Sequence, residues 1–101
     1  MAKLRFMEIL KPYRARIDAL DDQIIDLLAQ RLEIIHEVAE LKAARDIPAV
    51  LEDRVEEVIE RCVARAKEKG ADGQIIRRLY TVLVTACCDL ENDHIRKNDA
   101  A

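Results

Sequence analysis

An unbroken amphipathic stripe runs through the first half of the chain. Between Pro12 and Pro48, apolar residues recur at spacings of three and four, typical of one face of a single helix: Ile17, Leu20, Ile24, Leu27, Leu28, Ile34, Ile35, Val38 and Leu41. Proline suits a first helical turn and disfavours helix in the residue before it, so we expect this helix to span Pro12 to Arg45. Leu4 to Leu10 can add an earlier turn. At about 1.5 Å per residue such a helix is roughly 50 Å long and needs a partner along its length.

Two shorter helices are expected to follow. The second is marked by Val55, Val58, Ile59, Cys62, Val63 and Ala66. We expect it to start near Leu51 to Asp53 and to end at Gly70, a natural left-handed C-cap. Asp72 offers an N-cap for a third helix, which should persist to between His94 and Lys97. The polar tail beyond it is expected to be flexible.

Length and composition bound the fold class. The 101 residues show no linker or repeat, so we predict a single domain over residues 1–101 with its core at about residues 10–95. With only two Gly and two Pro, and 37% charged residues, long helices are favoured over strands. Aromatic residues make up 3% of the chain, so the core must come from aliphatic contacts or from a partner subunit. We therefore predict an all-α fold of three helices, the first very long, in an intertwined homodimer.

Several classes of function are disfavoured. The net charge of −3 and the scattered basic residues argue against a nucleic-acid or membrane surface. The apolar runs are shorter than a membrane span and the N-terminus lacks a signal-peptide core, so we place the protein in the cytoplasm. Three cysteines without CxxC spacing suggest reduced thiols rather than disulfides or a zinc site. The chain has no Ser, no coupled His pair and no Gly-rich phosphate loop, so we expect neither a nucleophile nor a metal nor a cofactor.

Charged residues interrupt the apolar stripes at a few positions. Continuing the first stripe by four residues from Leu27 reaches Arg31, and from Val38 reaches Lys42, so both should face inward on nearly the same side of the helix. On the third helix Glu91 follows Cys87 by four and also falls on the buried stripe. The cations can instead snorkel from the stripe edge, and Glu91 can be an exposed residue or a simple ion pair.

Two further arginines carry information. Arg54 lies near the start of the second helix, where a basic residue opposes the helix dipole, although a solvated surface arginine is equally compatible with the pattern. Arg14 precedes Arg31 by seventeen residues, or about 25 Å on one straight helix. One small ligand cannot span that distance, so a site using both arginines must take Arg14 from a second chain. Together these cations suit a reaction that redistributes charge within a bound anion.

The spacing of these residues resembles the all-helical chorismate mutase family over about residues 10 to 95. The matching positions are Arg14, Ile17, Asp18, Leu20, Asp21, Arg31, Lys42, Asp53 and Arg54. The resemblance implies an intertwined dimer with two shared sites and no cofactor. In each site, Arg14 of one chain and Arg31 of the other would grip the substrate carboxylates, with Arg54 completing these contacts.

The resemblance also assigns the reaction and the remaining site residues. Lys42 would donate to the ether oxygen that gains negative charge during the Claisen rearrangement of chorismate to prephenate. The apolar wall would come from Val38, Leu51, Val55, Val84 and Cys87. Glu91 stands where many members of the family have Gln. We hypothesise that it acts in its protonated form because burial disfavours the charged one, unless nearby cations keep it ionised.

A second departure leaves the substrate open. Leu51 and Val55 are apolar where typical mutases place acids that read the ring C4 hydroxyl. The segment from Ile47 to Val55 is similar instead to isochorismate pyruvate lyases and to mutases of 4-amino-4-deoxychorismate. Chorismate mutase is therefore the leading prediction, either sister activity is the alternative, and a helical dimer that binds without turnover is a third possibility.

Overall fold

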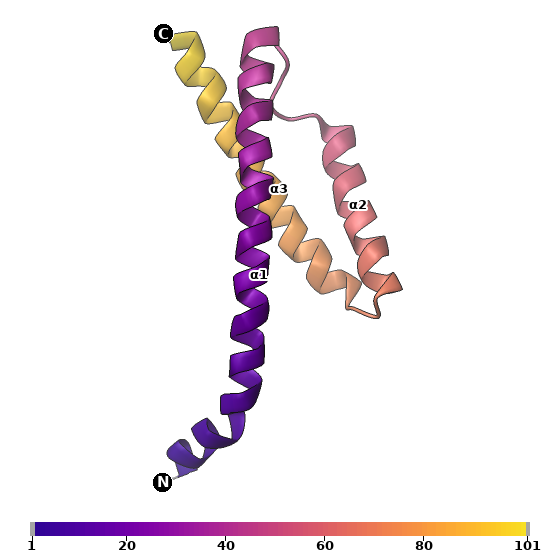
Figure 1. Ribbon diagram of the computed structural model, residues 1–101. Helices are drawn as coiled ribbons and strands as arrows, with labels where there is room; N and C mark the ends of the chain where they lie inside the picture. The colour runs from indigo at the N-terminus through magenta and orange to yellow at the C-terminus, as the bar shows by residue number, and fades with distance from the viewer. Residues whose placement is uncertain (1, 101) are drawn as a thin grey trace. The chain divides into compact units, whose positions relative to one another are not determined.

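The computed structural model describes residues 2–100, which form three helices and contain no strand. Helix α1 spans Ala2–Arg45, α2 spans Glu52–Glu68 and α3 spans Gly73–Ala100 (Figure 1). The all-α class and the long first helix are thereby confirmed. Helix α1 starts ten residues before Pro12, and α3 continues past Lys97. None of the described helices is long and apolar enough to cross a membrane.

The chain divides into two compact units, one ending at Glu33 and the other starting at Ile34. The single-domain boundaries and the intertwined dimer stay predictions.

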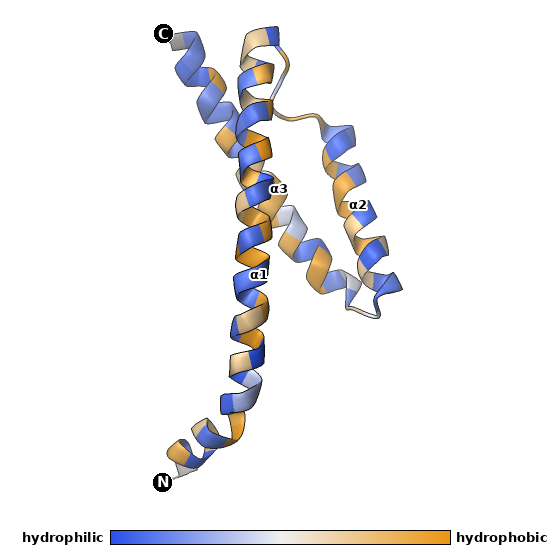
Figure 2. Cartoon of the chain, viewed as in Figure 1, coloured by the Kyte–Doolittle hydropathy of each residue, from blue (hydrophilic) through white to orange (hydrophobic). Residues whose placement is uncertain are grey.

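The first unit is the N-terminal part of α1, and its apolar side chains are exposed. Phe6, Leu10, Tyr13, Ile17, Leu20, Ile24 and Leu27 follow one another at alternating spacings of four and three, and each is between 40% and 64% exposed. Figure 2 shows the corresponding hydrophobic bands recurring along α1. A strict repeat of this kind is typical of the seam by which one helix packs against another. The described residues of the chain do not bury this seam.

Pro12 lies inside α1 and disturbs it. Proline has no N–H to donate to the carbonyl four residues earlier, and its ring crowds that carbonyl, so helices bend there. The N-terminal end of α1 turns away from the rest of the first unit accordingly (Figure 1). Residues 3–11 thus form a distinct helical segment ahead of the bend.

The second unit contains the end of α1 together with α2 and α3. Its core is small: Ala39, Ala49, Val63, Ala66, Val84 and Cys87. Helix α2 packs against α3. Next to the turn that connects them, Gly73 at the start of α3 lies close against α2. A Cβ atom at Gly73 would lie 3.2 Å from Val63 Cγ1 and 3.0 Å from Lys67 Cε. A small core in a chain with so much exposed apolar surface leaves stability dependent on further burial.

The predicted caps between α2 and α3 are confirmed. Gly70 has a φ of 74°, the left-handed conformation that ends many helices. Its N–H donates to the Lys67 carbonyl at 3.0 Å, and the next N–H, of Ala71, donates to the Ala66 carbonyl at 2.8 Å. Asp72 Oδ1 accepts from Gln74 N at 2.8 Å and caps the start of α3. These contacts fix the turn that sets α3 against α2.

An exposed ion pair joins the two helices beyond this turn. Arg77 donates through both terminal nitrogens to Glu60, at 2.6 Å and 3.1 Å. The hydrogen bond from Arg77 lowers the pKa of Glu60 below its usual 4.5, and the same contact raises the pKa of Arg77. Because the pKa of the folded carboxyl is depressed, the pair stabilises the fold when Glu60 is ionised.

We predict a pH-dependent cost for Glu60→Gln. The pair's contribution is complete at neutral pH and is lost as the pH falls below 4.5 and through the lowered pKa of the folded carboxyl. The melting temperature of Glu60→Gln should therefore lie below that of the parent at neutral pH and converge with it in acid. Thermal unfolding by circular dichroism checks this, with exposed Glu56→Gln as control. A gap that persists unchanged in acid would contradict the assignment.

Candidate active site

The connection after α1 folds back onto the end of that helix. Asp46 adopts a φ of 53°, and the N–H of Ile47 donates to the Lys42 carbonyl at 3.0 Å. Pro48 follows, and Ala49 is buried at 5% exposure. This path brings the Ala49 carbonyl to the Lys42 side chain, whose Nζ donates to it at 2.8 Å. A backbone acceptor thereby fixes the position of the ammonium group.

Lys42 also meets Glu91, which reaches it from α3. Lys42 Nζ lies 2.8 Å from Glu91 Oε1, and the two side chains are only 13% and 6% exposed. The angles of this contact are not those of a hydrogen bond, so Oε1 is a buried acceptor without a hydrogen-bond donor among the described residues. The attraction between Lys42 and Glu91 is therefore one between opposite charges. Lys42 keeps N–H groups beyond the one given to Ala49.

The nearby thiol of Cys88 is not a nucleophile. Burial raises its pKa, the negative charge of Glu91 raises it further, and Lys42 offsets part of the effect. Because only a thiolate attacks well, a thiol with a raised pKa is inert at neutral pH. Among the described residues, no three His, Cys, Asp or Glu side chains are placed to hold a metal ion. The chemistry available at Lys42 is electrostatic.

The residues predicted for the apolar wall differ in burial. Val84 and Cys87 are buried on α3, at 7% and 4% exposure. Val38 and Val55 are half-buried, and Leu51 is 44% exposed. The side chain of Leu51 thus keeps much of its surface open at the start of α2, and its part in a wall stays a prediction.

The three arginines predicted for the site lie elsewhere on the helices. Arg54 is exposed near the start of α2 and pairs with Glu57, one turn further along. Such a surface ion pair contributes little to stability, so Arg54 can readily leave Glu57 to bind a ligand. Arg14 and Arg31 both belong to the first unit, where Arg14 is exposed and Arg31 is half-buried. The second unit therefore brings Lys42 and Glu91 into contact, and the roles of the arginines stay predictions.

The backbone carbonyl that accepts the Lys42 hydrogen bond could not be identified from the sequence. The acceptor that holds Lys42 is a backbone carbonyl, and every residue carries one, so only the path of the connection identifies Ala49. Pro48 and the short side chain of Ala49 are compatible with that path.

The Lys42 and Glu91 contact generates a prediction about stability. In Lys42→Met the buried Glu91 carboxylate loses its counter-charge. The free energy of unfolding, measured in urea, should therefore be about 3 kcal/mol lower than in the parent. The double variant Lys42→Met/Glu91→Leu should recover most of that loss because neither charge remains. Arg54→Met, which breaks an exposed pair, is the matched control and should cost about 0.5 kcal/mol or less. Equal losses in Lys42→Met and Arg54→Met would mean that the pair is not buried as described.

Several proteins of known activity are similar to this chain. A 4-amino-4-deoxychorismate mutase from Streptomyces pristinaespiralis is 31% identical over 87 residues, covering 86% of this chain and 67% of the relative. Another of the same name, from Streptomyces venezuelae, is 30% identical over 83 residues, covering 82% and 81%. A bifunctional chorismate mutase/prephenate dehydratase from Aquifex aeolicus is 28% identical, and the chain spans 24% of its length. No solved structure matches the chain significantly.

The family match covers most of the chain. It extends over residues 13–92, and so includes Arg14, Arg31, Lys42, Arg54 and Glu91. The segment ahead of Pro12 and the last turns of α3 lie outside it. With this match and the two Streptomyces relatives, the chain belongs to the chorismate mutase type II family.

Proposed function

We propose that this protein catalyses the Claisen rearrangement of chorismate to prephenate in sites shared between two chains. The observation that supports this most directly is the fixed ammonium group of Lys42, held between the Ala49 carbonyl and Glu91. Membership of the chorismate mutase type II family supplies the reaction class.

The rearrangement needs charge stabilisation and little else. The bond between the ring and the ether oxygen breaks while a carbon–carbon bond forms in the same molecule, so no proton, electron or group enters or leaves. Negative charge develops on the ether oxygen as its bond to the ring lengthens. An N–H of Lys42 aimed at that oxygen stabilises the transition state more than the bound substrate. Because Lys42 is already held in place, it need not reorganise during the reaction.

Glu91 is assigned a role through Lys42. An ionised carboxylate cannot donate to the ether oxygen, but it can orient an ammonium group. The 2.8 Å contact between the two side chains supports this positioning role. Glu91 then acts as a positioning residue, and Lys42 remains the donor.

The two substrate carboxylates require cations that one chain does not bring together by itself. Arg14 and Arg31 are separated by seventeen residues of α1, or about 25 Å along a helix. The exposed seam of α1 is a surface on which a second copy of the chain can bind. We propose a homodimer in which Arg14 of one chain joins Arg31, Lys42 and Arg54 of the other around a chorismate-like dianion.

A second candidate substrate is 4-amino-4-deoxychorismate. Two relatives with this substrate in their names cover most of the chain. In addition, the site as proposed has apolar Leu51 and Val55 where an acid would read a C4 hydroxyl. Both substrates undergo the same rearrangement, so the proposed roles of Lys42 and Glu91 are the same for each.

Assays with both substrates test the proposal. The purified protein should consume chorismate, followed by its absorbance, and release prephenate, identified by chromatography. The 4-amino analogue is assayed in parallel, and the ratio of the two kcat/KM values decides between them. Lys42→Ala should lower kcat by about 10² to 10³ while the helical circular dichroism is kept. Lys97→Ala, an exposed lysine on α3, is the control. Release of salicylate and pyruvate from isochorismate, or no turnover of any of the three, would reject the proposal.

Mixing inactive variants tests the shared site. Arg14→Ala and Arg31→Ala are each expected to be inactive, but a mixed dimer has one site with both arginines. Since half of randomly formed dimers are mixed and each has one intact site, activity should return to about a quarter of the parent. Mixing Arg31→Ala with Lys42→Ala is the control, because these residues are proposed to act from the same chain. Restoration in the control, or none in the first mixture, would show that the residues are distributed differently.

A further inference from the structure

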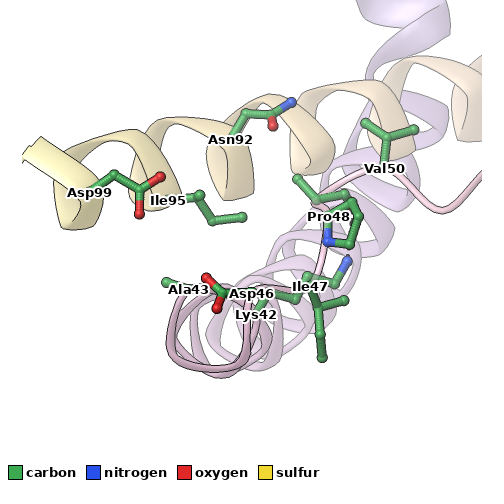
Figure 3. Close-up of a pocket in the computed structure, with 10 residues that line it drawn as sticks. Lys42, Ala43, Asp46, Ile47, Pro48, Val50, Asn92, Ile95 and Asp99 are labelled. Carbon is green, nitrogen blue, oxygen red and sulfur yellow. Dashed lines mark hydrogen bonds between the residues drawn. The ribbon is translucent and has the colours of Figure 1, made fainter.

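A groove in the second unit lies directly beside the Lys42 site. It has a volume of about 410 Å³ and is lined by the end of α1, the following connection and α3. Its apolar surface comes from Ile47, Pro48, Val50 and Ile95, and Lys42 lies within it (Figure 3). Whatever covers this groove also covers the part of Lys42 that lines it.

The negative charges that line the groove disfavour binding of the dianionic substrate there. Asp46 from the end of α1 and Asp99 from the last turns of α3 both line it. Two carboxylates repel a dicarboxylate, and the one cation present, Lys42, is already paired with Glu91. An occupant that matches this groove therefore carries apolar side chains and positive charge.

The segment ahead of the Pro12 bend has this chemistry. Leu4, Phe6, Met7, Ile9 and Leu10 are between 40% and 61% exposed. Lys3, Arg5 and Lys11 lie among them, with Glu8 as the single acid. This segment precedes the family match at residue 13. It therefore lies outside the part of the chain that the family match covers.

The proposed shared site determines where a partner's segment would lie. In a parallel helix pair the partner's Arg14 would be level with Arg14, about 25 Å from Arg31. Only an antiparallel pair brings the partner's Arg14 beside Arg31. Continuing from there toward the partner's N-terminus leads toward the C-terminal end of α1. With the partner's Arg14 level with residues 31 to 36, the partner's Pro12 is level with about residues 33 to 38. The bend at Pro12 turns the segment ahead of it off the axis of the helix pair.

We propose that the segment Lys3–Lys11 of a second copy covers this groove and shields the Lys42 site from water. Phe6 and Leu10 keep the spacing of the seam ahead of the bend and are exposed, so the segment has an apolar face of its own to bury. Its basic residues face Asp46 and Asp99. The proposal rests on the proposed function, since the shared site supplies the antiparallel register. Excluding water from Lys42 strengthens its attraction for the developing charge.

Photo-cross-linking tests the contact directly. Phe6 is replaced by p-benzoylphenylalanine in the full chain, and isotopically light and heavy proteins are mixed so that mass spectrometry separates links between chains from links within one. We expect links between chains, from position 6 to residues 46–50 or 92–99. Glu8→p-benzoylphenylalanine is the matched control, because position 8 lies on the opposite face of the helix from the seam. Links within one chain, equal links from position 8, or none would overturn the proposal.

A basic, apolar helical segment can also bind an anionic membrane surface, which would compete with the groove for the segment. The experiment is therefore repeated with phosphatidylglycerol vesicles. Links between chains that persist support the proposal, and their complete replacement by links to lipid overturns it.

Kinetics provide the second readout. Phe6→Ala should lower kcat/KM by about fivefold, as expected for truncating one well-packed interface side chain, whereas Glu8→Ala should change it by less than about twofold. Equal effects would count against the groove contact. Cross-links between chains in a protein that turns over none of the substrates would reject the proposed function alone. Full activity without such cross-links would reject this inference alone.

Discussion

The contact between Lys42 and Glu91 is the interaction on which the site depends. Two charges with side chains 13% and 6% exposed would be costly apart, because each loses most of its hydration. Together the two charges attract each other, and the Ala49 carbonyl removes much of the remaining freedom of the ammonium group. The same arrangement that tolerates a buried charge therefore also holds it in place for the proposed reaction. A site of this kind needs the connection after α1 to be as well ordered as the helices.

The second constraint is the uncovered seam of α1. Seven large side chains from Phe6 to Leu27 are at least 40% exposed, while the core of the second unit consists mainly of small side chains. Burying the seam would supply the apolar area that this short chain lacks. If a second copy supplies that cover, as we propose, then folding, assembly and completion of the site are one process. Mutations along the seam would then reduce activity through the dimer without touching the substrate.

Helical periodicity predicted much of this fold, because it depends on local patterns. The three helices, the Gly70 C-cap and the Asp72 N-cap follow from apolar spacing and cap chemistry. Lys42 and Glu91 stood out as charges on apolar stripes, but their mutual contact depends on the tertiary structure of the second unit. The Ala49 carbonyl could not be predicted, since it depends on the path of a connection. The continuation of α1 through Pro12 was expected only as an added turn over Leu4 to Leu10, because proline favours the first turn of a helix over its interior.

Glu91 also bears on how the site discriminates between ligands. Four cations are proposed around the substrate, Arg14, Arg31, Lys42 and Arg54, and the Glu91 carboxylate reduces their net charge to three. The substrate dianion then leaves an excess of one positive charge, close to the place where the ether oxygen becomes negative. With a neutral side chain at position 91 the excess would be two, and ground-state binding of any dianion would be stronger. A carboxylate at this position would thus weaken the binding of substrate and transition state alike, and in the proposed site its contribution to turnover is the position that it gives Lys42.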